Sequence, residues 1–386
     1  MSNTQTKNVP ELRFPGFEGE WEEKKLEDII KVNSGKDYKH LDKGDIPVYG
    51  TGGYMTSVSE PLSEIDAVGI GRKGTINKPY LLEAPFWTVD TLFYCTPKKE
   101  TDILFILSLF RKINWKVYDE STGVPSLSKQ TINKINRFVP TNKEQQKIGK
   151  FFSKLDRQIE LEEQKLELFQ QQKKGYMQKI FSQELRFKDE SGNDYPDWEE
   201  KELGEVADRV IRKNKNFESK KPLTISGQLG LIDQTEYFSK SVSSKNLENY
   251  TLIKNGEFAY NKSYSNGYPL GAIKRLTRYD SGVLSSLYIC FSIKSEMSKD
   301  FMEAYFDSTH WYREVSGIAV EGARNHGLSN ISVNDFFTIL IKYPSLEEQR
   351  KIGDFFIKLD RQIELEEQKL ELLQQRKKAL LKSMLI

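Results

Sequence analysis

The sequence contains one fifteen-residue segment twice, unchanged. KLDRQIELEEQKLEL occupies residues 154–168 and again residues 358–372. Both copies lie inside longer repeats, 144–174 and 348–378, in which 26 of 31 aligned pairs are identical at an offset of 204 residues. A repeat of this fidelity predicts two equivalent structural units in one chain.

A fainter repetition extends through the rest of the chain. ELRFPGFEGEWEEKKLEDI (11–29) resembles ELRFKDESGNDYPDWEEKELGEV (184–206), which matches Trp21 with Trp198. The stretches between these blocks share order more than sequence. DTLFYC (90–95) resembles SSLYIC (285–290), placing Cys95 opposite Cys290, and a later pair of segments places Leu127 opposite Leu328. The chain therefore alternates variable and constant parts.

Six segments follow from this pattern. They are an N-terminal conserved segment (1–28), a first variable module (29–140), a central conserved helix (141–182), a linker that repeats the N-terminal segment (183–206), a second variable module (207–344) and a C-terminal conserved helix (345–386). Each module mixes short β-like runs with one amphipathic helix, expected at 102–112 and 299–312. The fold class predicted is α+β, with two small α/β modules and two long helices.

The conserved helices carry apolar residues at alternating spacings of four and three, the spacing of a coiled-coil seam. The predicted seam consists of Ile148, Phe152, Leu155, Ile159, Leu166 and Phe169 in the first copy, and Ile352, Phe356, Leu359, Ile363, Leu370 and Leu373 in the second. Glu and Lys interrupt both seams, at 162 and 173 and at 366 and 377.

An antiparallel pair would set Glu162 against Lys377 and Lys173 against Glu366, whereas a parallel pair would bring the two glutamates together. We therefore predict an antiparallel coiled coil with an internal pseudo-two-fold repeat. The alternative is that the polar residues lie at the solvent edge of the seam.

Composition and motifs argue against several classes of protein. The net charge is only +2, and the two cysteines lie far apart, which fits a reducing compartment. The N-terminus has no long apolar run, so no signal peptide is expected, and no segment is apolar enough to span a membrane. The sequence has no GxxxxGK[ST] phosphate loop, no Asn-Pro-Pro-aromatic run and no metal-ligand spacing among its three histidines. PDWEEK (196–201) suggests a nuclease only superficially, because it repeats the linker-like EWEEKK (20–25). We expect a chain that is not catalytic and holds no metal.

Polar loops with Gly, Asn and basic residues interrupt the strands of both modules. Arg, Lys, Asn and Ser are the side chains that bond phosphates and base edges, although such loops are also common as solvated turns. The candidate nucleic-acid contacts are Arg72, Lys73, Thr75, Asn77, Lys78 and Lys129 in the first module, and Arg212, Lys213, Lys262, Ser263, Arg324, Asn325 and His326 in the second.

The order of variable and constant parts resembles that of the specificity subunit of type I restriction–modification systems. IPVYGTGG, GRKGTINKP and SLSKQTINKI carry the resemblance, as do EQQKIGKFFSKLD and its twin EQRKIGDFFIKLD, over nearly the whole chain from about residue 11. The resemblance implies that each variable module is a target recognition domain for one half of a split, asymmetric site in double-stranded DNA. It also implies that the helices set the gap between the halves and dock two methyltransferase subunits, with two restriction subunits joining the assembly.

The same resemblance implies a location in the bacterial cytoplasm, without a membrane partner. S-adenosylmethionine, ATP and Mg²⁺ would belong to the partner subunits and not to this chain. Within GRKG it implies DNA contacts at Arg72 and Lys73, with Thr75 and Asn77 beside them. The second module departs from GRKG, and Lys262 is the nearest counterpart. A scaffold that binds two proteins through its modules is the alternative that the duplication alone leaves open.

Overall fold

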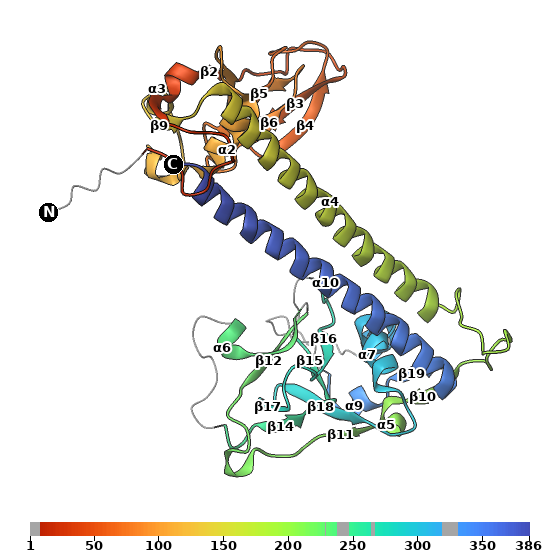
Figure 1. Cartoon of the computed structure of the whole chain (residues 1–386). Coiled ribbons are helices and arrows are strands. Elements are labelled where there is room, and N and C mark those ends of the chain that lie inside the picture. The colour runs from red at the N-terminus through yellow and green to blue at the C-terminus, as the bar shows by residue number, and fades with distance from the viewer. Residues whose placement is uncertain (1–7, 228, 238–246, 264–266, 319–330) are drawn as a thin grey trace. The chain divides into compact units, whose positions relative to one another are not determined.

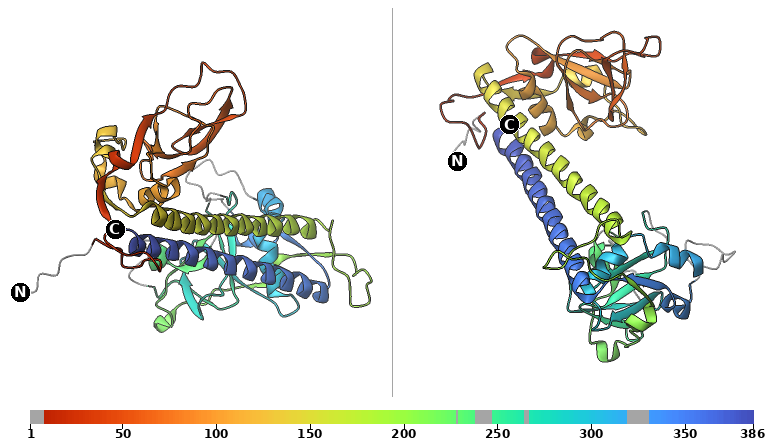
Figure 2. Two further views of the ribbon diagram at one scale, coloured as in Figure 1. Left: turned by 45° about the horizontal axis from the view of Figure 1, so that its top comes forward. Right: turned by 90° about the vertical axis from the view of Figure 1, so that its right-hand side faces the viewer.

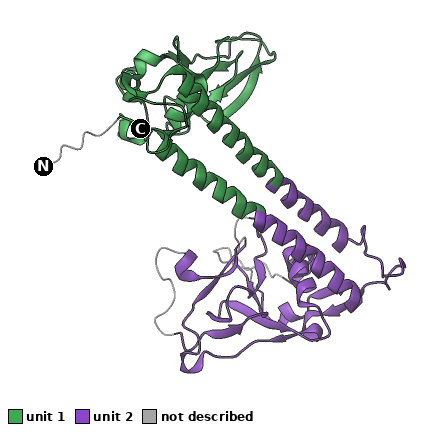
Figure 3. Ribbon diagram, in the orientation of Figure 1, with its two compact units in different colours: residues 1–165, 366–386 green, residues 166–365 purple. Residues whose placement is uncertain are grey.

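In the computed structural model the chain forms two compact units (Figures 1 and 3). The structure describes residues 8–227, 229–237, 247–263, 267–318 and 331–386. Unit 1 comprises residues 1–165 and 366–386, and unit 2 comprises residues 166–365. Two long helices, α4 (Asn142–Phe181) and α10 (Leu346–Met384), each contribute one part to each unit. No helix within the described ranges is both long and apolar enough to cross a bilayer.

Unit 1 holds the first variable module. Its elements are β1 (Glu22–Lys25), α1 (Leu26–Ile29), β2 (Ile30–Ser34), β3 (Ile46–Gly50), β4 (Gly53–Val58), β5 (Ala67–Gly71), β6 (Tyr80–Leu82), β7 (Trp87–Thr88), β8 (Leu92–Pro97), α2 (Ile103–Lys112), a 3-10 turn (Trp115–Tyr118), α3 (Lys129–Asn133) and β9 (Asn136–Val139). A four-stranded antiparallel sheet runs in the order β2-β8-β5-β6, β1 pairs with β9, and the β3–β4 hairpin pairs with β7.

Unit 2 repeats part of this topology and has two further strand pairs. Its elements are β10 (Glu199–Glu202), α5 (Leu203–Val206), β11 (Ala207–Arg209), a 3-10 turn (Lys215–Phe217), β12 (Leu223–Ser226), β13 (Gly230–Asp233), α6 (Gln234–Tyr237), β14 (Thr251–Lys254), β15 (Phe258–Asn261), β16 (Ala272–Arg275), β17 (Ser281–Leu284), β18 (Tyr288–Ile293), α7 (Lys299–Asp307), α8 (Tyr312–Ile318), α9 (Val333–Phe337) and β19 (Leu340–Tyr343). Its four-stranded sheet runs β11-β18-β15-β16, and β10 pairs with β19 as β1 does with β9. The two further pairs are β12 with β13 and β14 with β17. The last three residues of PDWEEK thus belong to strand β10, which pairs with β19. Its charged residues are therefore part of a strand pair.

The two sheets correct the sequence alignment by one residue. Cys95 pairs with Val68, whereas the residue paired with Phe258 at the same place in unit 2 is Phe291. Cys95 and Phe291 both pack in the main core of their module, while Cys290 belongs to a separate cluster on the other side. Because successive side chains of a strand point to opposite faces, a slip of one residue reverses every orientation. The match of Cys95 with Cys290 was therefore wrong.

A second correction concerns the segment before each long helix. Ser128 caps α3 by accepting a hydrogen bond from the Thr131 amide, and Ser332 caps α9 in the same way from Asp335. The buried residue that precedes each cap is Leu127 in one unit and Ile331 in the other. Leu127 therefore corresponds to Ile331, and its predicted partner Leu328 lies outside the described residues.

Within each unit, parts of α4 and α10 lie side by side and antiparallel (Figures 1 and 2). In unit 1 the buried Leu155 and Ile159 of α4 cluster with Leu373 of α10. In unit 2 the Phe181 ring near the end of α4 stacks on Phe356 near the start of α10, with ring centroids 5.9 Å apart. The antiparallel coiled coil is confirmed.

The predicted seam is shorter than the periodicity indicated. Ile148 and Phe152 pack in the core of the first module, and Ile352 packs with Phe356 in the core of the second. Leu166, Phe169, Leu359, Ile363 and Leu370 are half-buried along the helices. The first turns of each helix therefore use their apolar face to hold a module.

The predicted ion pairs across the seam were wrong. Glu162 pairs with Lys369 at 2.7 Å, and Glu366 pairs with Lys165 at 2.5 Å. Lys377 reaches Asp156 instead, and Lys173 reaches Asp360, both at 2.5 Å. The hydrogen bond from Lys165 lowers the pKa of Glu366. The negative charge of each seam glutamate is therefore balanced by a lysine of the opposite helix, Glu162 by Lys369 and Glu366 by Lys165.

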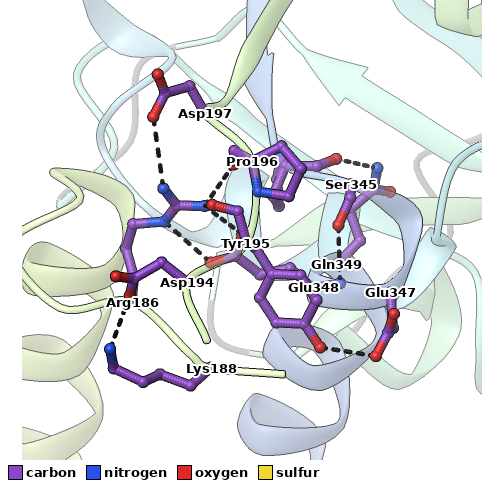
Figure 4. Close-up of polar contacts among 11 residues, drawn as sticks. Arg186, Lys188, Asp194, Tyr195, Pro196, Asp197, Ser345, Glu347, Glu348 and Gln349 are labelled. Carbon is purple, nitrogen blue, oxygen red and sulfur yellow. Dashed lines mark hydrogen bonds and ion pairs between the residues drawn. The ribbon is translucent and has the colours of Figure 1, made fainter. Parts of the chain in front are cut away.

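The first turn of each long helix contains a buried carboxylate. In unit 2, Arg186 donates through Nη2 to Glu348 Oε2 at 2.8 Å and to the carbonyls of Tyr195 and Pro196 (Figure 4). Glu348 is fully buried, and its hydrogen bond raises the pKa of Arg186. Arg13 holds Glu144 in unit 1 through two contacts of 2.7 Å.

The next residues of the pattern EQxKIG bind the helix of the module. Gln145 accepts from the amide of Asp102, and Gln349 accepts from the amide of Ser298. A Cβ on Gly149 would lie 2.7 Å from the Phe105 amide nitrogen, and one on Gly353 would lie 3.0 Å from that of Phe301. The repeated Glu, Gln and Gly therefore share one task, which is to seat the helix closely against its module.

This geometry predicts the stability of two neighbouring variants. Arg186→Ala leaves the Glu348 carboxylate buried without its partner, and we expect the free energy of unfolding to fall by about 3 kcal/mol. Lys188→Ala is the matched control, because it removes only an exposed pair with Asp194, worth under about 1 kcal/mol. Urea unfolding of the full chain measures both, and equal losses would contradict the assignment.

Candidate nucleic-acid interface

The structure brings together the two polar loops of the first module that the sequence singled out. Lys73 forms a β-bridge with Ser126, the Gly74 amide donates to the Pro125 carbonyl at 2.8 Å, and the Leu127 amide donates to the Arg72 carbonyl at 2.9 Å. Loops 71–78 and 121–129, about fifty residues apart in sequence, therefore form one surface.

Arg72 and Lys73 are exposed on this surface. The Arg72 guanidinium lies 5.9 Å from the centre of the Phe93 ring, and its Nη1 is 3.5 Å from the Asp90 carbonyl oxygen. The backbone amide of Arg72 donates to the Thr91 carbonyl at 2.8 Å. The main chain is thus fixed while the guanidinium faces solvent.

The glycines of GRKG are required by the backbone. A Cβ on Gly71 would lie 2.2 Å from the Thr75 carbonyl oxygen, and Gly74 has φ +86°. Only glycine adopts such a φ without strain. Thr75 is half-buried behind this turn, whereas Asn77, Lys78 and Lys129 are exposed on the same two loops.

Two acidic residues that sequence reasoning missed hold the second loop in shape. Asp119 accepts hydrogen bonds from the Ser126 and Ser121 amides, and these bonds lower its pKa. Glu120 accepts from the hydroxyls of Thr131 and Ser128, which lowers the pKa of Glu120. Asp119 and Glu120 lie only two to eleven residues before these partners in the sequence. An acidic residue so close to serines and a threonine is a local turn signal, which the sequence contains.

In the second module, Lys262 occupies the place of Arg72. β15 of unit 2 corresponds to β5 of unit 1, because β15 pairs with β18 as β5 pairs with β8. In this correspondence Asn261 matches Gly71, and Lys262 matches Arg72. Lys262 Nζ donates to the Ile331 carbonyl at 3.2 Å, and Ile331 is the residue that corresponds to Leu127 beside Arg72. Ser263 follows it, half-buried. The counterpart suggested by sequence therefore has the matching position.

The other candidates of the second module are placed differently. Arg212 makes a two-point contact with Glu257, at 2.9 and 3.2 Å, and a bond to the Leu252 carbonyl. The hydrogen bond that Arg212 donates to Glu257 raises the pKa of Arg212. Lys213 Nζ donates to the Asn249 carbonyl at 2.9 Å. Arg212 and Lys213, like Lys262, thus bond groups of their own module. Arg324, Asn325 and His326 lie outside the described residues.

The described residues contain no group of three or more His, Cys, Asp or Glu arranged to hold a metal ion. Cys95 and Cys290 are buried free thiols whose pKa values are raised by burial.

A family model described as "Type I restriction modification DNA specificity domain" matches residues 18–170 and 195–375. These two matches cover both halves of the internal repeat and most of the chain. The chain belongs to this family of type I restriction–modification specificity subunits.

Individual relatives agree with that assignment. The type I restriction enzyme MjaVIII specificity subunit of Methanocaldococcus jannaschii is 25% identical over 343 residues, covering 84% of this chain and 76% of the relative. The crystal structure of the type I restriction–modification S subunit from M. genitalium superposes with a TM-score of 0.65 at 15% identity, covering 98% of this chain and 99% of that one. The second likeness is one of fold.

Proposed function

We propose that the two variable modules read the two halves of a bipartite, asymmetric target in double-stranded DNA. The observation that carries this proposal is that the two modules share a scaffold but differ in their loops. Arg72 and Lys262 occupy corresponding positions of the two modules, but the sequences around them differ. Two readers of one design with different side chains suit a target whose halves differ. A near-neutral chain gains little from phosphate neutralisation alone, so partner subunits would contribute to affinity.

The long helices would set the gap between the half-sites and dock two methyltransferase subunits, with two restriction subunits joining the assembly. In this proposal the chain is non-catalytic and works in the bacterial cytoplasm. S-adenosylmethionine, ATP and Mg²⁺ are used by the partners. A scaffold that binds proteins alone is disfavoured by the exposed basic side chains Arg72, Lys73, Lys78 and Lys129, which gather on two neighbouring loops.

Exposed leucines on the helices support the docking role. Leu161 and Leu168 of α4 are 48% and 52% exposed, and their repeats Leu365 and Leu372 of α10 are 53% and 65% exposed. Residues seven apart lie on one face of a helix, and all four lie outside the buried seam. Exposed apolar residues repeated in this way are typical of a partner-binding surface, and the duplication offers it twice.

Exchange of residues 207–344 for the corresponding module of another specificity subunit tests the central proposal. We expect one half of the methylated sequence to change and the other to stay, as mapped by long-read detection of methylated adenines in DNA modified by the complex. A change in both halves, or in neither, would refute independent reading. Binding whose affinity does not depend on salt would favour the protein scaffold.

Arg72→Ala and Lys262→Ala test the matched positions. Loss of a base contact should reduce discrimination in the first half-site for Arg72→Ala and in the second for Lys262→Ala, each by about 1–3 kcal/mol. Competition binding with oligonucleotides mismatched in either half measures this. A uniform loss on all DNA, with a salt slope lowered by about one, would instead make the residue a phosphate contact.

Leu161→Glu combined with Leu365→Glu tests the docking surface. We expect methyltransferase binding by the purified subunit to weaken at least about tenfold, as for loss of an interface hot spot, with unchanged thermal unfolding. Val117→Glu is the control, because Val117 is 73% exposed but lies in the first module. Unimpaired binding by the double leucine variant would place the docking surface elsewhere.

A further inference from the structure

Each variable module carries a β-hairpin whose turn is held by a tyrosine hydroxyl. Tyr80 donates to the Gly50 carbonyl at 2.6 Å at the β3–β4 turn. Tyr268 donates to the Gly227 carbonyl at 2.7 Å at the β12–β13 turn. Tyr80 is the first residue of β6, whereas Tyr268 lies four residues before β16. Each module therefore holds the turn of its hairpin with a tyrosine hydroxyl, but the two tyrosines come from different places in the chain.

Close packing leaves no room for a side chain at Gly50 or Gly227. A Cβ on Gly227 would lie 1.9 Å from the Tyr268 ring, and one on Gly50 would lie 2.7 Å from the Met55 sulfur. The Tyr49 ring contacts those of Tyr54 and Tyr80, with centroid distances of 6.3 and 6.2 Å. Both turns are thus braced from behind by aromatic side chains.

The tips of both hairpins present apolar side chains to solvent. Tyr54 is 63% exposed and Met55 is 53% exposed on the first hairpin, and Leu229 is 58% exposed on the second. Exposing apolar groups on a braced turn gains no folding energy. The feature recurs although the sequences GTGGYM and the corresponding stretch of the second module differ.

The first tip lies beside the basic loop. The Val89 amide donates to the Tyr49 carbonyl at 3.0 Å, and Val89 Cγ2 lies 3.5 Å from the position of a Cβ on Gly50. The next two residues bind Arg72, through the Asp90 carbonyl at its guanidinium and the Thr91 carbonyl at its amide. Residues 89–91 therefore have the hairpin on one side and Arg72 on the other.

We propose that the hairpin tips are apolar wedges that pack against DNA bases, Tyr54 and Met55 in the first half-site and Leu229 in the second. Apolar side chains inserted at a base step unstack it, and bases stack on aromatic rings. In the first module the neighbouring Arg72 would attract a phosphate that flanks such a step. A protein partner fits less well, because a stable interface buries about 800 Å² on each side, more than one or two side chains offer. This inference rests on the proposed reading of DNA by the modules.

The test uses the reconstituted complex with its methyltransferase subunits and a duplex carrying 2-aminopurine in each half-site. The double variant Tyr54→Ala with Met55→Ala should weaken specific binding roughly 5- to 150-fold and reduce the fluorescence change in the first half-site only. Leu229→Ala should act on the second half-site. Because no cation is lost, the salt slope should stay as in the wild type.

Matched controls come from exposed apolar residues elsewhere in each module. Ile65→Ala and Leu287→Ala remove side chains that are 60% and 61% exposed, and should leave binding unchanged. Tyr54→Phe with Met55→Leu should retain binding, because it keeps the apolar surface. Thermal unfolding shows whether each variant is folded.

Wild-type affinity and fluorescence in the folded tip variants would overturn the wedge, and so would losses equal to those of the controls. Weakened methyltransferase association with normal DNA binding would also overturn it and make the tip a protein contact. In either case the effects of Arg72→Ala would still report on the proposed function. That function itself would fail if the wild-type complex showed no sequence-specific binding.

Discussion

The structure depends on one buried ion pair, formed once in each unit. Glu144 and Glu348 are the first residues of the repeat and are almost fully buried, so each requires a partner of opposite charge. Arg13 and Arg186 supply it from segments that reach their helix by different routes. Arg186 follows the end of α4 in sequence, whereas Arg13 belongs to the N-terminal segment, whose Leu12 amide bonds the Ser383 carbonyl near the end of α10.

Each long helix needs an arginine-bearing segment beside its first turn, which explains why the N-terminal segment is repeated as a linker. In unit 2 the Leu185 amide donates to the Lys179 carbonyl, and Lys179 corresponds to Ser383 at the offset of 204. The same backbone bond is therefore local in sequence in unit 2, whereas in unit 1 it joins two segments that lie far apart in the sequence. In unit 1 Lys112 also donates to the carbonyls of Lys382 and Leu385.

Much of this fold could be predicted from the sequence because the repeat is nearly exact where the two long helices lie. The antiparallel pairing followed from charge, but the partners did not, because their identity depends on a register that periodicity leaves free. Glu162 meets Lys369 and not Lys377, eight residues farther along. In the modules the alignment failed by one residue at Cys290, since apolar strands score alike in either register, and only the pleat distinguishes them. The bracing of Gly50 by Tyr80 could not be predicted, because no local pattern joins residues thirty apart.

The variable modules meet the constant helices through charges of opposite sign. Arg111, in the last turn of α2, pairs with Asp156, which also holds Lys377. At the corresponding place in unit 2, Asp307 pairs with Lys173, which also holds Asp360, and with Lys274 of its own module. The helix residues of the two sites are the same Asp and Lys, repeated at an offset of 204. A constant Asp–Lys pair offers a partner to a cation from one module and to an anion from the other. Divergent modules can therefore dock on identical helices without any change in the helices themselves.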